Sequence, residues 1–290
     1  MNTDRTMIVP VQKDDVLLAD VAAARAEPEA LHLWWLGQSG FLVQWQGRRL
    51  LFDPYLSDSL TTKYAATDKP HVRMTERVIA PERLDGIDVV TSSHNHTDHL
   101  DAATLQPLMA ANPGLTVVVP AANVAFAADR LDVDPARLTP LTADAPVTVA
   151  GFTLHSVPAA HEELDQDAQG RHRTIGIVAQ CGPWTIYHSG DTVRYPGMDD
   201  ILRAWPIDVA ILPINGSRPE RRVAGNLDGA AAAQLAHDIG AGVVIPCHYE
   251  MFEFNTASPA LFEATCHDLG QPYATLRAGE HRRFEKASHP

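Results

Sequence analysis

Four side chains that can ligate a metal fall within six residues of one segment. SHNHTDHLD, at 93–101, follows the apolar run DVVTSS at 88–93, which is typical of a buried strand. Imidazole nitrogens and carboxylate oxygens are ligands for zinc, manganese and iron. In a regular helix, residues 94 and 96 would diverge by about 200°, so the spacing indicates a loop rather than a helical H-E-x-x-H site. A surface loop that merely contains histidines explains the pattern poorly. The cluster consists of His94, His96, Asp98 and His99.

Three more metal-competent side chains each follow another strand-like run. His161 comes after FTLHSVPAA, Asp191 after WTIYHSG, and His248 after GVVIPC. Taken singly, each has an ordinary explanation: a loop histidine, a turn aspartate or a packed core histidine. Their shared setting, with the loop cluster upstream, favours metal ligands and supplies enough donors for a second ion.

Short apolar strands and helical stretches must position these residues. The order is antiparallel strands first and strand–helix alternation later, which predicts two sheets in the core with helices outside. A polar excursion at 57–83 interrupts this pattern, and long excursions are often functional. Helices are expected at 14–27, 100–110, after Pro120, and at 198–204, 228–239 and 259–268; strands are expected at 31–36, 41–45, 49–53, 88–93, 116–120, 152–158, 174–180, 184–189, 208–214 and 242–247.

Bulk composition narrows the class of protein. The chain has 290 residues, enough for one large α/β domain or two small ones, and a net charge of -13. An acidic surface disfavours nucleic-acid and membrane partners, and no apolar run is long enough to cross a bilayer. Three cysteines without C-x-x-C spacing, and an N-terminus without an apolar signal region, fit a cytoplasmic protein. We expect a small-molecule substrate; the oligomeric state stays open, a homo-oligomer included.

Nucleotide and serine-hydrolase motifs are absent from the sequence. There is no G-x-x-x-x-G-K-[ST] and no dinucleotide glycine fingerprint. G-x-S-x-G is also absent, and GQSG at 37–40 has the wrong spacing.

The segment HNHTDH resembles the H-x-H-x-D-H signature of the metallo-β-lactamase superfamily, and the later His, Asp and His are similar to the rest of its ligand set. The resemblance implies a four-layer αββα sandwich with metals at one edge. It implies one domain over residues 1–290, with an N-terminal helical extension over about residues 1–30. Two divalent ions, zinc or manganese with iron as a further option, would be the cofactors. The implied first metal ligands are His94, His96 and His161; the second are Asp98, His99 and His248; Asp191 would bridge.

Further blocks resemble the ascorbate-6-phosphate lactonase and its relatives. They are LWWLGQSGFLV, DPYLSD, YHSGDT, IDVAILPING, GNL and IPCHYEMF. This resemblance spans residues 31–252 and implies lactone-opening chemistry. His161 departs from the lactonase pattern, which supports a full two-metal site and weakens transfer of the lactonase substrate.

Several residues have both a functional and an ordinary interpretation. The resemblance implies that Asp53 hydrogen-bonds a histidine ligand, whereas a turn or cap aspartate before Pro54 is equally compatible. His188 is a candidate for catalysis or substrate contact, and a packed strand histidine is at least as compatible. Tyr249 lines the pocket or simply packs.

Cationic side chains in two loops are candidates for substrate binding. Arg218, Arg221 and Arg222 follow DVAILPING, and guanidinium groups bind carboxylate or phosphate well. A solvated charged loop is the alternative. We predict that at least one of these arginines faces the metal pocket. The excursion at 57–83 offers Lys63, His71 and Arg73 for the same role.

The resulting hypothesis is a hydrolase whose metal-bridging hydroxide opens a lactone or related cyclic ester of a small anionic or sugar-derived substrate. Asp98 would orient the nucleophile while ligating, as a catalytic residue. A phosphodiesterase acting on a small substrate would use the same residues and is the alternative. A di-iron redox protein would need a second cofactor domain, a nucleic-acid processor would need a basic surface, and a non-catalytic relative would have lost ligands.

Overall fold

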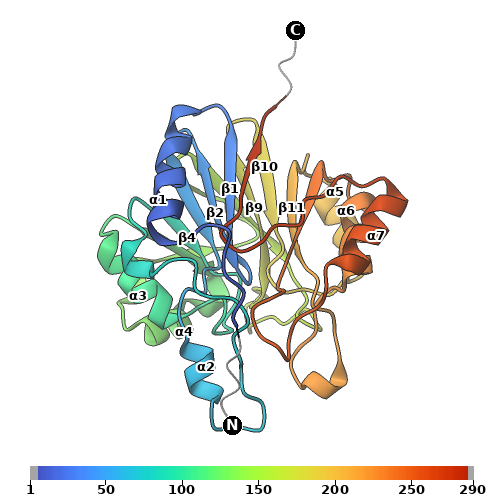
Figure 1. Cartoon of the computed structure of the whole chain (residues 1–290), viewed down its shortest axis with the longest axis horizontal. Coiled ribbons are helices and arrows are strands. Elements are labelled where there is room, and N and C mark those ends of the chain that lie inside the picture. The colour runs from blue at the N-terminus through green and yellow to red at the C-terminus, as the bar shows by residue number, and fades with distance from the viewer. Residues whose placement is uncertain (1–5, 287–290) are drawn as a thin grey trace.

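Two stacked β-sheets form the centre of the molecule, in a computed structural model that describes residues 6–286. Figure 1 shows α1, α3 and α4 on one side of the sheets and α5, α6 and α7 on the other. The four-layer αββα sandwich expected from the sequence is therefore confirmed. In the part of the chain that the structure describes, no helix has the length and apolar character to span a membrane.

The first sheet has the strand order β13-β1-β2-β3-β4-β5-β6, and the second has the order β12-β11-β10-β9-β8-β7. The strands are β1 (Leu31–Gly37), β2 (Gly40–Trp45), β3 (Arg48–Phe52), β4 (Val89–Thr91), β5 (Thr116–Pro120), β6 (Leu138–Leu141), β7 (Val147–Val149), β8 (Phe152–Pro158), β9 (Ile175–Cys181), β10 (Trp184–His188), β11 (Val209–Pro213), β12 (Val243–Cys247) and β13 (His281–Phe284). The α-helices are α1 (Asp14–Ala23), α2 (Ser59–Tyr64), α3 (Ala102–Ala111), α4 (Val124–Leu131), α5 (Met198–Arg203), α6 (Gly229–Asp238) and α7 (Ala260–Leu269). Short 3₁₀ helices are η1 (Ala24–Ala26), η2 (Pro81–Arg83), η3 (Ala121–Asn123), η4 (Pro135–Arg137) and η5 (Pro219–Arg221).

Strand β1 shows how the sequence specifies two buried layers. Successive side chains of a strand point to opposite faces, so a strand covered on both faces is apolar throughout. Leu33 and Trp35 lie in the cluster between the sheets, whereas Trp34 and Leu36 lie in the outer cluster with Leu17 of α1. The run LHLWWL is thus explained by helices on one side and a second sheet on the other.

The N-terminal helix belongs to the outer layer of the sandwich. Leu17 and Val21 of α1 are buried against the first sheet, and Asp20 accepts a hydrogen bond of 2.7 Å from the Trp34 indole. The predicted helix at 14–27 ends as an α-helix at Ala23 and continues as η1. Residues 1–5 of the predicted extension, and 287–290 of the predicted domain, lie outside the described residues.

The expected elements differ from the structure at a few places. Strands β6, β7 and β13 are not among the predicted strands, because their sequences are short and half polar. β13 pairs with β1 and is the edge strand on that side of the first sheet. The polar excursion at 57–83 contains the helix α2.

Parallel pairing brings the functional loops to one edge. β3, β4, β5 and β6 run parallel in the first sheet, as do β10, β11 and β12 in the second. Carboxyl ends of parallel strands lie at the same edge of a sheet, where open α/β folds bind ligands. The segments that leave β3, β4, β10 and β12 carry Asp53, the HNHTDH cluster, Asp191 and His248 respectively. The fold therefore collects side chains that are far apart in sequence.

Candidate metal centre

The first group of predicted ligands converges at this edge. His94, His96, His161 and Asp191 each offer one ligand atom, and these atoms lie within 4.8 Å of one another. Nε2 of His161 lies 3.2 Å from Nδ1 of His96 and 3.7 Å from Oδ2 of Asp191. Four donors at these separations can surround a single cation.

A second group lies beside the first. Asp98, His99 and His248 also offer ligand atoms within 4.8 Å of one another. Asp191 faces this group as well, because its Oδ1 is 3.3 Å from Nε2 of His99 and its Oδ2 is 3.4 Å from Nε2 of His248. The structure thus brings all seven predicted ligands together: these two groups match those that the resemblance implied, and Asp191 lies between them. A third, overlapping group joins Asp53 to His94 and His99.

Asp53 holds one of these ligands in place. It follows β3, is fully buried and has a φ of 37°. Its Oδ2 lies 2.7 Å from Nδ1 of His99, and its carboxylate accepts hydrogen bonds from the amide and hydroxyl of Ser93. A carboxylate accepts, so Nδ1 of His99 carries a proton and Nε2 faces Asp191, where it can bind a metal or, without metal, a second proton. Of the two interpretations of Asp53, the structure favours the histidine partner.

Other ligands are oriented in the same way. Nδ1 of His161 lies 3.1 Å from the carbonyl of Gly225, so this nitrogen donates and Nε2 remains a bare donor atom for a metal. Nδ1 of His94 lies 3.0 Å from the Ser93 hydroxyl. Backbone and side-chain partners therefore turn the unprotonated nitrogens inward.

Unpartnered polar atoms test whether a cation fits. Among the described residues, Nε2 of His94, Nε2 of His99 and Oδ1 of Asp191 are buried and make no hydrogen bond. Buried polar atoms nearly always have a hydrogen-bond partner, yet Nε2 of His94 has none within residues 6–286, and Nε2 of His99 and Oδ1 of Asp191 face each other at 3.3 Å without forming a hydrogen bond. Divalent cations accept such nitrogen and oxygen ligands, so the residues fit a metal centre.

Charges inside the cluster are strongly coupled. Burial lowers the pKa of His248, but the Asp191 charge and hydrogen bonds to Asp191 and Asp98 outweigh it and raise this pKa to about 9. Burial raises the pKa of Asp191, but the charges of His248 and His99 hold it well below its usual value. Burial is the largest cause of the lowered pKa of His94. Without metal, protons on the second-group histidines neutralise the carboxylates, so metal ions and protons compete for the same sites.

Gln38 is a site residue that the sequence analysis missed. It lies in the turn between β1 and β2, is fully buried and has a φ of 50°. Its side-chain amide nitrogen donates to Oδ2 of Asp98 at 2.8 Å. Its backbone carbonyl accepts a 3.0 Å hydrogen bond from the backbone amide of His248. The available signals were its place in the block LWWLGQSGFLV and in a turn between two apolar strands.

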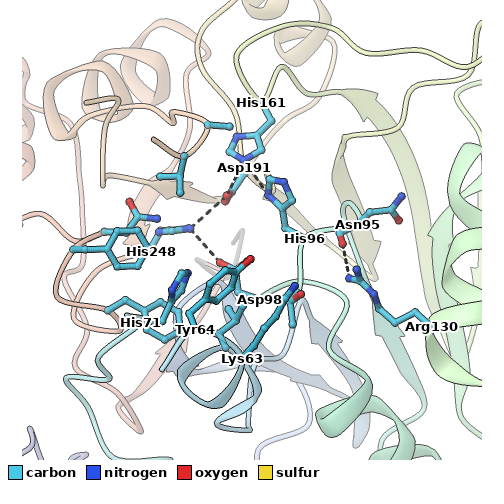
Figure 2. A pocket seen from close by; sticks show the side chains of 17 residues that line it. Lys63, Tyr64, His71, Asn95, His96, Asp98, Arg130, His161, Asp191 and His248 are labelled. Carbon is cyan, nitrogen blue, oxygen red and sulfur yellow. Dashed lines mark hydrogen bonds and ion pairs between the residues drawn. The ribbon is translucent and has the colours of Figure 1, made fainter. Parts of the chain in front are cut away.

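A cavity of about 250 Å³ opens over the two groups. Figure 2 shows Asp98, His96, His161, Asp191 and His248 around it. Its lining also includes Leu60, Lys63, Tyr64, His71, Asn95, Thr97, Arg130, Val223, Ala224, Phe252, Phe254 and Asn255.

The cations of the cavity are Lys63 and Arg130, not the predicted arginines. Arg221 is buried and donates to the carbonyls of Asn215 and Thr256. Arg222 is exposed and pairs with Asp68 at 2.8 Å. Arg218 is exposed, and none of the three lines the cavity.

The predicted arginine loop reaches the cavity through other residues, because Val223 and Ala224 line it. Arg73, the third candidate that the sequence analysis named in the excursion, lies outside the cavity lining. It pairs with Asp58 at 2.7 Å and donates to the Ser57 and Thr75 carbonyls.

Arg130 was not among the predicted site residues, because it lies in the helical run after Pro120. Its guanidinium donates to the carbonyls of Asn95 and Leu100, so it also braces the ligand loop.

The structure places His188 and Tyr249 outside the cavity lining, in the packed positions that the sequence analysis kept as alternatives to a catalytic or substrate-binding role. Nε2 of His188 lies 2.9 Å from the Ser39 carbonyl, and Nδ1 accepts from the Gly190 amide at 3.2 Å. The His188 ring is buried and stacked on Phe52 with centroids 5.0 Å apart, outside the cavity lining. The hydroxyl of Tyr249 donates to the Leu276 carbonyl, and its ring packs on Trp35.

Known proteins are similar to this chain in sequence and in fold. A family model described as a beta-lactamase superfamily domain matches residues 48–249. A protein of Methanosphaerula palustris, named a metal-dependent hydrolase, is 28% identical over 223 residues, covering 76% of this chain and 84% of that protein. Because the family model matches more than half of the chain, the protein belongs to the β-lactamase superfamily.

Solved structures show the same architecture. A metallo hydrolase from the archaeon Ignicoccus hospitalis superposes with a TM-score of 0.65 at 21% identity, over 89% of this chain and all of that one. The isothiocyanate hydrolase from Delia radicum gut bacteria superposes with a TM-score of 0.69 at 20% identity, over 88% of this chain and all of that one. At such identities the likeness shows the fold alone.

Metal content gives the first test. Wild-type protein should bind about two divalent ions per chain, as two-metal hydrolases do. His96→Ala removes one donor of the first group and should lose metal together with activity. Elemental analysis after dialysis measures this, with His267→Ala, at an exposed position, as control. A folded wild-type protein that takes up no ion would contradict the assignment.

Asp53 gives a second test, since it acts on His99 rather than on the metal. Asp53→Ala should weaken metal binding by about 10- to 100-fold, as loss of a ligand's hydrogen-bond partner typically does. Competition against a chelator measures the affinity, and circular dichroism verifies the fold. Asp268→Ala, an exposed carboxylate, is the matched control. Unchanged affinity in a folded Asp53 variant would show that His99 needs no such support.

Proposed function

We propose that the protein is a metal-dependent hydrolase that opens a lactone or related cyclic ester of a small anionic or sugar-derived substrate. The observation that carries the proposal is the shared carboxylate of Asp191 between two ligand groups, on the floor of a small cavity bordered by Lys63 and Arg130. Two bound divalent ions, zinc or manganese with iron as a further option, would supply a hydroxide at neutral pH and polarise the substrate oxygen.

The chain's own residues would fix the geometry of the reaction. Gln38 donates to Oδ2 of Asp98, and this oxygen also lies 3.5 Å from Nε2 of His248. The Asp98 carboxylate is therefore held in one orientation, from which it can orient the attacking water. Such pre-organisation lowers the barrier, because no reorganisation is needed during the reaction.

The cavity favours a small anion as substrate. A volume of about 250 Å³ lies at the lower end of the range for ligand pockets, which matches a small molecule. The net charge of -13 repels anions at long range, so local cations must offset it. Lys63 has no carboxylate partner among the described residues, and Arg130 has its guanidinium at the rim beside Asn95 (Figure 2).

The lactonase-like sequence blocks support the class of chemistry more than the substrate. GQSG provides Gln38, YHSGDT provides Asp191, and IPCHYEMF provides His248. GNL provides the Gly225 carbonyl that orients His161. These blocks therefore surround the ligands, whereas the cationic rim comes from other segments.

Comparison of two substrate classes tests the proposal. Metal-loaded protein should hydrolyse small anionic lactones faster than phosphodiesters of similar size, because the negative charge on the phosphoryl group of a diester repels the attacking hydroxide at the reacting centre. Initial rates over a panel of sugar lactones, phosphorylated lactones and alkyl phosphodiesters, with zinc and with manganese, measure this. Turnover of phosphodiesters alone would favour the alternative, a small-molecule phosphodiesterase.

Lys63 gives a test of the anionic substrate. Lys63→Ala should raise KM for an anionic lactone by about fivefold, the equivalent of ~1 kcal/mol for an exposed charge pair. KM for a neutral lactone, and metal content, should not change. Lys63→Arg keeps the positive charge, so its KM for the anionic lactone should stay close to that of wild type. Arg222→Ala, on the exposed arginine outside the cavity, is the negative control. Equal KM values for Lys63→Ala and wild type would remove Lys63 from the binding site.

A further inference from the structure

His71 lines the cavity without belonging to either ligand group. It comes from the excursion at 57–83 and is nearly buried. Its ring stacks on Tyr64 with centroids 4.2 Å apart and makes edge contacts with Phe252 and Phe254. Figure 2 shows it beside Tyr64, on the same side of the cavity as His248. The ring is held by aromatic neighbours, so its orientation is fixed.

Backbone contacts determine the tautomer of this imidazole. Nδ1 lies 3.1 Å from the carbonyl of Lys69, and a carbonyl only accepts, so Nδ1 carries the proton. The hydroxyl of Thr61, on α2, donates to the carbonyl of His71 itself at 2.8 Å. Nε2 has no hydrogen-bond partner among the described residues, and in the neutral ring it presents a lone pair.

The surroundings keep the ring neutral. Burial lowers the pKa of His71, and this effect exceeds the opposite effects of the Lys69 carbonyl and the Asp98 charge. Lys63 and Lys69 also disfavour the cation. The seven metal ligands use their own imidazoles and carboxylates, so His71 is the remaining imidazole in the cavity lining.

We propose that Nε2 of His71 is the proton-transfer group of the reaction. The attacking hydroxide oxygen bonds to the ester carbonyl carbon without help from His71. Nε2 then takes the proton of that new hydroxyl, and the Lys69 carbonyl stabilises the imidazolium through Nδ1–H. As the ring C–O bond breaks with its electron pair on the alkoxide oxygen, this oxygen takes the proton from Nε2, and the product is a hydroxy carboxylate. This assignment rests on the hydrolase activity proposed above, but it holds for alkyl phosphodiesters as well as lactones.

Two substrates whose leaving groups differ in basicity can show whether His71 transfers a proton or has only a structural role. His71→Gln keeps a polar group near the Nε2 position but cannot shuttle a proton, and His71→Phe keeps the stacked ring. The probes are γ-butyrolactone, whose alkoxide must be protonated, and 4-nitrophenyl acetate, whose phenolate leaves unprotonated. Both variants should lose about 100-fold in kcat for the lactone, a typical contribution of general acid–base catalysis. Their kcat for the aryl ester should stay within about threefold of wild type, since acid assistance contributes little there. If the protein hydrolyses phosphodiesters instead of lactones, an alkyl and an aryl phosphodiester replace these two probes in the same comparison.

Metal content and NMR provide readouts besides activity. Both variants should retain the wild-type number of ions, because His71 is not a ligand. In metal-free protein, ¹⁵N-edited spectra of the His71 ring should show the Nδ1–H tautomer. Equal losses for both probes, loss of metal, unchanged lactone turnover or an Nε2–H tautomer would each overturn the assignment. A wild-type protein that hydrolyses neither pair would instead refute the proposed function.

Discussion

Asp191 places one carboxylate between imidazoles that come from three separate loops. Its oxygens lie 3.3 to 3.7 Å from nitrogens of His99, His248 and His161. A buried carboxylate is costly unless it is paired, and here two of its three partners, His99 and His248, are themselves buried and need a cation or a proton. The loops can carry this arrangement only because each begins at the end of a strand whose position is fixed by the sheets. The metal centre therefore depends on the two parallel strand sets ending at one edge.

Three residues in the turns around the candidate ligands have a strained backbone. Gln38, Asp53 and His248 all have positive φ values, which non-glycine residues adopt at a cost. Gln38 and His248 are joined through a backbone hydrogen bond, and Asp53 is held by Ser93 and His99. Gly190, beside Asp191, also has a positive φ, and a Cβ there would lie 2.6 Å from the Ser93 Cβ. Close packing of these turns thus compensates the strain and sets the ligand directions.

The ligands could be predicted from sequence because chemistry and position coincide in them. Each metal-competent residue follows an apolar run, and the fold brings such strand ends together. The same reasoning failed for the cations, since a sequence shows where a loop begins but not which way its side chains turn. Arg221 turns inward to carbonyls of its own neighbourhood, while Arg130 reaches the rim from α4. His188 illustrates a related limit: the last residue of β10 is also covered by Phe52 of the other sheet. Contacts between distant segments decide these cases.

Two segments outside the sheets shape the cavity above the ligands. The excursion and the loop after β12 pair through backbone hydrogen bonds, with the Met74 amide 2.8 Å from the Met251 carbonyl and the Glu253 amide 3.1 Å from the Val72 carbonyl. Tyr55, Leu60 and Phe252 form a small apolar cluster between them. Lys63 and His71 therefore stand on a segment that carries none of the seven candidate ligands, and the loop that begins with the candidate ligand His248 holds this segment in place. Substrate contacts and candidate ligands thus come from different stretches of the chain, joined by the backbone pairing of these two segments.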